Sequence, residues 1–159
     1  MSFSMFLKIA GVDGESMNKK FDKWITVESF SFGVENAAPT GGATGAGAGK
    51  VKFNEFHFVS PVQVSSPKLM TACVTGQHFK DATLNILGGN DATPFIKFRL
   101  TDVLVTSFST SGHSGDALPR DAFSLNFAQF EEDKSTRSPT GAIGEPVQAM
   151  FDIARLNVP

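Results

Sequence analysis

The sequence predicts a mainly β protein: a β-barrel of two packed antiparallel sheets, with one flanking α-helix at about residues 66–76. Apolar residues alternate with polar ones over most of the chain, which is the period of a half-buried strand. Only residues 66–76 combine helix start and stop signals with an apolar stripe. The chain has 159 residues, which predicts a single domain over 1–159 with a core of its own.

Strands are expected wherever the alternation is sustained between turn signals. These segments are 5–9, 24–35, 51–59, 82–87, 95–108, 123–127 and 147–156. Within 95–108, one face is expected to carry Ile96, Phe98, Leu100, Leu104 and Phe108. Polar loops are expected at 109–119 and 133–146, where Gly, Ser, Asp and Pro gather.

Two of the expected strands change phase part of the way along. Ile25 and Val27 share one face, whereas Phe30 lies on the other. The same change separates Phe53 from Phe56. A shift of one residue indicates either a bulge or a strand whose two halves bury opposite faces.

Residues 36–49 form a segment of almost pure Gly, Ala and Thr. Such a segment cannot bury a core of its own, and it is longer than a usual hairpin loop. It does not match a phosphate-binding loop, because Gly49 and Lys50 are followed by Val51 rather than by Ser or Thr. The run also precedes a strand, whereas a phosphate loop opens a helix.

The expected helix has a signal at each end. Ser66 is the expected N-cap, Pro67 suits the first turn and Gly76 suits the stop. The expected apolar stripe consists of Leu69, Met70, Cys73 and Val74. Cys73 is the single cysteine, and a thiol packed in this stripe is expected to be an unreactive small apolar group.

No catalytic pattern emerges from the polar residues. His57, His78 and His113 lack any partner at metal-ligand spacing. His113, Ser114 and Asp116 are the residue types of a hydrolytic triad, but they lie in one polar loop, whereas triad members converge from separate elements. We therefore expect no enzyme, no catalytic residue, no metal and no cofactor.

Charge and hydropathy limit the partners. The formal net charge of -2 and the scattered Lys and Arg residues predict no nucleic-acid binding. No stretch approaches the roughly 18 apolar residues of a membrane helix, so membrane insertion is not expected. Residues 1–16 carry Lys8 in a short apolar run that leads into a Gly-Asp-Gly turn, which does not resemble a signal peptide.

Several segments in order resemble the Hcp (haemolysin-coregulated protein) family, the tube subunit of the bacterial type VI secretion system. They are MFLKI at 5–9 with GES at 14–16, GAGKV at 47–51, SPKLMTACVTGQH at 66–78, LTDVLVTS at 100–107 and SLNFAQ at 124–129. The resemblance covers essentially the whole chain.

This resemblance implies a structural, phage tail tube-like role. Six copies would form a ring, rings would stack into the inner tube, and the lumen would carry and chaperone effector proteins. The sheath and spike proteins of the apparatus would be further partners. The protein would be made in the bacterial cytoplasm and exported by type VI secretion to the extracellular space or a target cell, without a cleaved signal peptide.

On this interpretation residues 36–49 reach toward the adjacent ring. The expected ring-stacking residues are Pro39, Thr40, Gly41, Gly42, Thr44, Gly45, Gly47 and Gly49. Glycine would allow close backbone packing and positive φ there.

Two other functions remain open from the residues alone. A monomeric small-molecule or glycan-binding β-barrel would have an apolar pocket with convergent polar groups. A hydrolase would depend on the loop that contains His113.

Overall fold

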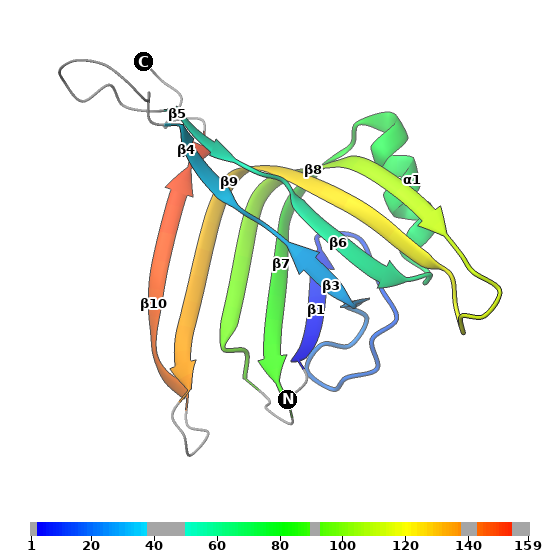
Figure 1. Cartoon of the computed structure of the whole chain (residues 1–159), viewed down its shortest axis with the longest axis horizontal. Helices are drawn as coiled ribbons and strands as arrows, with labels where there is room; N and C mark the ends of the chain where they lie inside the picture. The colour runs from blue at the N-terminus through cyan, green and yellow to red at the C-terminus, as the bar shows by residue number, and fades with distance from the viewer. Residues whose placement is uncertain (1–2, 38–49, 90–92, 138–142, 154–159) are drawn as a thin grey trace.

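The computed structural model describes residues 3–37, 50–89, 93–137 and 143–153 (Figure 1). Its elements are β1 (Phe3–Ile9), β2 (Ile25–Val27), β3 (Ser29–Ser31), β4 (Val34–Ala37), β5 (Lys50–Phe53), β6 (Phe56–Pro61), α1 (Ser66–Thr75), β7 (His78–Gly88), β8 (Ile96–Ser111), β9 (Arg120–Arg137) and β10 (Ile143–Asp152). Among the described residues, the predicted mainly β architecture with one flanking helix is confirmed.

The main sheet curls until it nearly closes. Its strand order is β2-β1-β7-β8-β9-β6-β3, and every pairing is antiparallel. β10 pairs, also antiparallel, with residues 129–137 of β9, on the edge of β9 that faces away from β8. β2 and β3 are consecutive in the chain yet lie at opposite ends of this order, because the chain turns from one to the other at Glu28. Figure 1 shows β3–β4 and β5–β6 crossing in front of the strands β1, β7, β8, β9 and β10.

The predicted changes of phase fall at breaks between strands. Glu28 separates β2 from β3, and Asn54 and Glu55 separate β5 from β6. Phe30 and Phe53 are half-buried and pack against the core despite their opposite phase. The breaks therefore let both halves of each segment turn their apolar side chains inward.

Three further strands make the same change together, at one row of the sheet. Their buried residues step from Phe79 to Ala82 in β7, from Leu100 to Val103 in β8 and from Phe127 to Phe130 in β9. Because the three steps lie side by side in register, the sheet bends along this row while its pairing continues.

This bend overturns one expectation for β8. Leu104 does not share the face of Leu100, because the buried positions switch to Val103 and Val105 after the bend. Asp102 lies at the row with φ of 55°, an unusual backbone conformation for a non-glycine residue. A register shift between Val105 and Ser107 then returns Phe108 to the inner face.

Aromatic rings fill the interior. The ring centroid of Phe32 lies 4.4 Å from that of Phe56 and 4.9 Å from that of Phe130. Phe56 also contacts Phe98 and Phe127 edge-on, at 5.2 and 5.8 Å. Burying one such side chain stabilises a fold by about 1.5–3 kcal/mol, so this cluster is a main source of stability.

The helix is confirmed, with two corrections. The N-cap is Ser65 rather than Ser66. The buried face holds Leu69 and Ala72, whereas Met70 is 51% exposed and Val74 is 82% exposed. The buried residues Leu69 and Ala72 are three positions apart on one face of the helix, so Met70 and Val74, half of the predicted apolar stripe, lie in solvent.

The end of the helix is as predicted. Gly76 stops it with φ of 68°, and the Gly76 N–H donates to the Ala72 carbonyl at 3.0 Å. A left-handed residue at this position is the usual helix stop.

Three predicted loops are shorter in the structure. β9 continues to Arg137 and β10 begins at Ile143, so most of the expected 133–146 loop is a strand pair. β8 runs to Ser111, and β4 includes the first residues of the 36–49 segment. Polar strands at an edge do not alternate in hydropathy, because solvent wets both faces, and the sequence pattern therefore missed them.

Candidate functional site

The strands β3, β6, β9 and β8 form a four-stranded sheet with two unlike faces. Its inner row consists of Phe30, Phe58, Phe123 and Phe108, which pair in that order across the strands. The rows on either side lie on the opposite face and carry Ser31, His57, Ser124 and Ser107, then Ser29, Val59, Ala122 and Ser109. Ser124 is buried within its row, beneath its hydrogen-bond partners. We call these two rows, with Ser111 and Asn126 beside them, the hydroxyl face.

A hydrogen-bond network holds the centre of the hydroxyl face. The Thr106 hydroxyl donates to Glu55 Oε2 at 2.8 Å and lies 2.9 Å from Ser124 Oγ. The Ser107 and Ser124 hydroxyls also share a hydrogen bond. Thr106 is the extra residue of the register shift in β8, so the network fixes the strand where its ladder is interrupted.

This four-stranded sheet has a free edge at each end. Within the described part of the chain, β3 pairs only with β6. β7 pairs with β8 no further than Leu104, so residues 105–111 of β8 have β9 on one side and no described strand on the other. Unpaired backbone groups along an edge are ready to pair with another strand.

An ion-pair cluster closes one end of the face. Arg120 Nε donates to Glu28 Oε2 at 2.7 Å, and its NH1 group donates to Asp116 Oδ2 at 3.2 Å. The hydrogen bond that Arg120 donates to Glu28, together with the charges of both carboxylates, raises the pKa of Arg120 above its ordinary value. The cluster ties the β2–β3 corner to the turn before β9.

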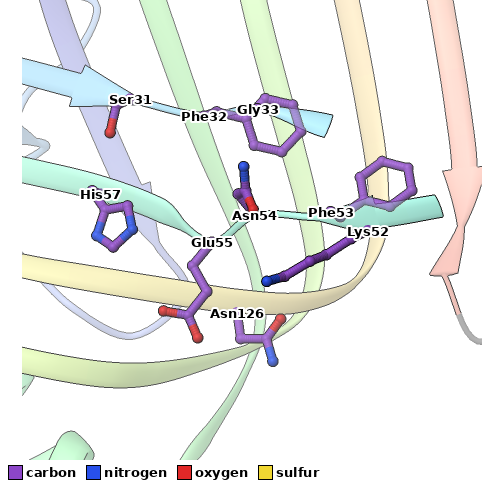
Figure 2. Close-up of a pocket in the computed structure, with 9 residues that line it drawn as sticks. All are labelled: Ser31, Phe32, Gly33, Lys52, Phe53, Asn54, Glu55, His57 and Asn126. Atoms are coloured by element: carbon purple, nitrogen blue, oxygen red, sulfur yellow. The ribbon is translucent and has the colours of Figure 1, made fainter. Parts of the chain in front are cut away.

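A groove of about 580 Å³ lies at the other end (Figure 2). Its lining residues are Ser31, Phe32, Gly33, Lys52, Phe53, Asn54, Glu55, His57 and Asn126. The groove opens where the β3–β4 and β5–β6 breaks face each other, since Ser31 pairs with His57 and Val34 with Phe53 on either side. Figure 2 shows Lys52 and Glu55 extending toward the same space, near Asn126.

The three histidines do not come together. The His78 Nδ1 lies 2.9 Å from Asp102 Oδ1 in an exposed pair. His113 accepts a hydrogen bond from the Gly115 N–H in the exposed turn, while Asp116 binds Arg120 instead. Among the described residues, no three His, Cys, Asp or Glu side chains form a metal-binding group.

The expectations for ring stacking and for membrane insertion have different outcomes. The expected ring-stacking residues, from Pro39 to Gly49, lie outside the described residues. None of the described helices is long and apolar enough to span a bilayer.

The hydroxyl face was not anticipated from the sequence, although a signal was present. Serines recur at every second position at 29 and 31 and again at 107, 109 and 111. Alternating Ser opposite Phe predicts a strand with a small polar outer face, but only strand pairing shows that these runs share one surface.

Comparisons with known proteins agree with this geometry. Residues 6–133 match the family model described as "Type VI secretion system effector, Hcp". The chain is 36% identical over 161 residues to Protein hcp1 of Pseudomonas aeruginosa, with 99% of each chain covered.

Solved structures show the same fold. One described as a type six secretion system protein superposes with a TM-score of 0.92 at 26% identity, covering 98% of this chain and 99% of that one. Hcp1 from Salmonella typhimurium superposes with a TM-score of 0.77 at 24% identity, with 97% of each chain covered. Sequence and fold together show that the chain belongs to the Hcp family of the type VI secretion system.

Proposed function

We propose that this protein is the structural subunit of a hexameric ring, which stacks into the inner tube of type VI secretion and carries effector proteins in its lumen. The observation that carries the proposal is the four-stranded sheet with two free edges and a small polar outer face. Family membership supports the tube role.

The free edges suggest how the ring closes. β3, β6, β9 and β8 alternate in direction, so β8 of one copy is antiparallel to β3 of the next. A head-to-tail contact of this kind joins two different surfaces, and a closed ring leaves no edge unpaired.

The hydroxyl face suits the wall of a passage. Its Ser side chains are short and offer hydrogen bonds, and Val59 and Ala122 are the only apolar residues among those that define it. With β8 and β3 joined around the ring, this face becomes one continuous surface, while the Phe row stays in each subunit's core. We assign the hydroxyl face to the lumen.

The remaining parts of the proposal concern stacking and export. Residues 39–49, which lie between β4 and β5 in the sequence, would contact the next ring. The sheath and spike proteins would be further partners. The role is structural rather than catalytic. The chain would leave the bacterial cytoplasm through the apparatus itself, without a cleaved signal peptide.

Disulfide trapping tests ring closure. Ser29→Cys is combined with Ser107→Cys, Ser109→Cys or Ser111→Cys in a Cys73→Ser background, so that three registers are sampled. Within one copy, β3 and β8 are three strand spacings apart, about 14 Å, which is too far for a disulfide. We expect one pair to give a ladder of up to six covalently linked chains on non-reducing gels.

Each single-cysteine variant is the control and should give no ladder beyond dimers. If every pair stays monomeric on the gel while the same sample forms rings by negative-stain electron microscopy, the edge contact is wrong. If the wild-type protein is a monomer at micromolar concentration, the ring itself is wrong.

The alternative of a monomeric barrel with a ligand inside is less well supported. The interior between the described strands is occupied by packed aromatic rings. The groove of about 580 Å³ lies outside this core and has largely polar lining residues.

A further inference from the structure

We infer that the groove at the end of the hydroxyl face binds a carboxylate-bearing segment of the cargo protein. The inference rests on the proposed function, because the groove shares Ser31, His57 and Asn126 with the face assigned to the lumen. The residues that would recognise the acidic segment are Lys52, Asn54, His57 and Asn126 (Figure 2).

Two acceptor oxygens of the groove are already engaged. Glu55 Oε2 accepts a hydrogen bond from the Thr106 hydroxyl at 2.8 Å. Asn126 Oδ1 accepts one from the Phe127 N–H at 2.9 Å.

The donors of the groove are not engaged. Within the described part of the chain, no hydrogen bond or ion pair is formed by the ammonium group of Lys52, the imidazole of His57 or the side-chain amide of Asn54. The Asn126 amide NH₂ is likewise unused. Four unused donor groups in one groove favour a ligand rich in acceptors, and a carboxylate forms stronger hydrogen bonds with cationic donors than a neutral group does.

A nearby carboxylate does not neutralise Lys52. Glu35 lies directly across from Lys52 in the β4–β5 pair, but it forms no ion pair with Lys52 and does not line the groove. The positive charge of Lys52 therefore remains available to a ligand, and Glu55 is the only carboxylate among the lining residues.

The size of the groove indicates a segment rather than an ion. About 580 Å³ falls in the range of sites that hold drug-sized molecules. Phe32 and Phe53 supply an apolar wall for the stem of a side chain. A few residues of an extended Glu- or Asp-containing chain fit this description.

Fluorescence anisotropy with the full-length protein tests the inference. The probe is a fluorescein-labelled decapeptide of alternating Glu and Ser, and its counterpart carries Lys in place of Glu. We expect the Glu peptide to bind more tightly than the Lys peptide. Lys52→Glu should weaken it at least about fivefold, since an attraction becomes a repulsion.

Two further variants complete the set. Glu55→Gln should tighten binding of the Glu peptide, because it removes the negative charge while keeping an acceptor for Thr106. Lys97→Ala removes an exposed lysine outside the groove and should leave binding unchanged. A purely structural role for Lys52 and Glu55 would not move the affinity in opposite directions.

Size-exclusion chromatography with light scattering on the same samples separates the outcomes. Equal binding of both peptides, or no effect of Lys52→Glu on binding, overturns the inference. If the same sample forms rings, the proposed function still stands. Loss of rings in Lys52→Ala also overturns it, because the groove is then a contact between copies. A monomeric wild-type protein refutes the ring, whatever the peptide does.

Discussion

At the scale of residues, one buried carboxylate joins the helix to the sheet. Asp121 is 1% exposed and accepts hydrogen bonds from the hydroxyls of Ser66 and Thr110, the latter at 2.9 Å. Ser66 in turn accepts from the Gln63 N–H at 3.1 Å. Ser66 was expected to cap the helix, yet its hydroxyl anchors the helix start to β9.

Asp121→Ala should destabilise the protein by about 2–3 kcal/mol, because it leaves the buried Ser66 hydroxyl without an acceptor. Urea unfolding at fixed protein concentration measures the effect. Asp116→Ala is the matched control and should cost less than about 1 kcal/mol, since its ion pair with Arg120 is exposed. Equal losses for the two variants would contradict the anchoring role.

Gly14 is a second residue whose replacement should be costly. A Cβ there would lie 2.5 Å from both Ile25 Cα and the Trp24 carbonyl oxygen, and backbone cannot easily move away. Gly14→Ala should lower stability by about 1–3 kcal/mol in thermal or urea unfolding. Gly112→Ala, whose nearest contact would be Pro119 Cβ at 3.5 Å, should change it little.

At the scale of elements, the bend across β7, β8 and β9 decides which side chains reach the core. The buried positions change phase in all three strands at one row, and Asp102 lies there in the left-handed region. Aspartate tolerates that conformation better than most residues, and here its carboxylate also meets His78.

Asp102→Val should destabilise the fold by about 1–2 kcal/mol, because a β-branched residue is strained at this φ. Asp102→Gly removes the same carboxylate but keeps positive φ accessible, so it should remain near wild type in thermal unfolding. If both variants lose equal stability, the contact with His78 rather than the backbone is what matters.

At the scale of the whole molecule, α1 and β10 carry half of the large exposed apolar side chains in the described part of the chain. Met70 and Val74 of α1 and Val147, Met150 and Phe151 of β10 are all more than two-fifths exposed. Exposed apolar surface of this kind is typical of a protein that assembles. Such surface is consistent with the proposed ring.

Deletion of residues 40–48 should leave rings intact and weaken their stacking. The β4–β5 pair reaches Ala37 and Lys50, so a short connection still closes the hairpin after the deletion. Negative-stain electron microscopy should show single rings in place of stacks, and secretion should fall. Tubes of normal length together with normal export would refute the stacking role.

Much of the architecture was predictable because it depends on local periodicity. The Phe-rich alternation placed β1, β6 and the buried part of β9, and Gly76 marked the end of α1. The polar part of the β9–β10 pair, at 133–137 and 143–146, was missed, since strands wetted on both faces carry no alternation. Leu104 was placed on the wrong face, because a coordinated bend is invisible within one strand.

The sequence by itself determined the fold class, the family resemblance and the lack of an organised catalytic pattern, since these depend on composition, spacing and motif order. Only the tertiary structure located the hydroxyl face and the free strand edges on which the proposed function rests. Ser31, His57, Ser124 and Ser107 come from four separate strands, and only the pairing register aligns them in one row. Strand pairing joins residues far apart in the chain, so no local pattern specifies a face or an edge.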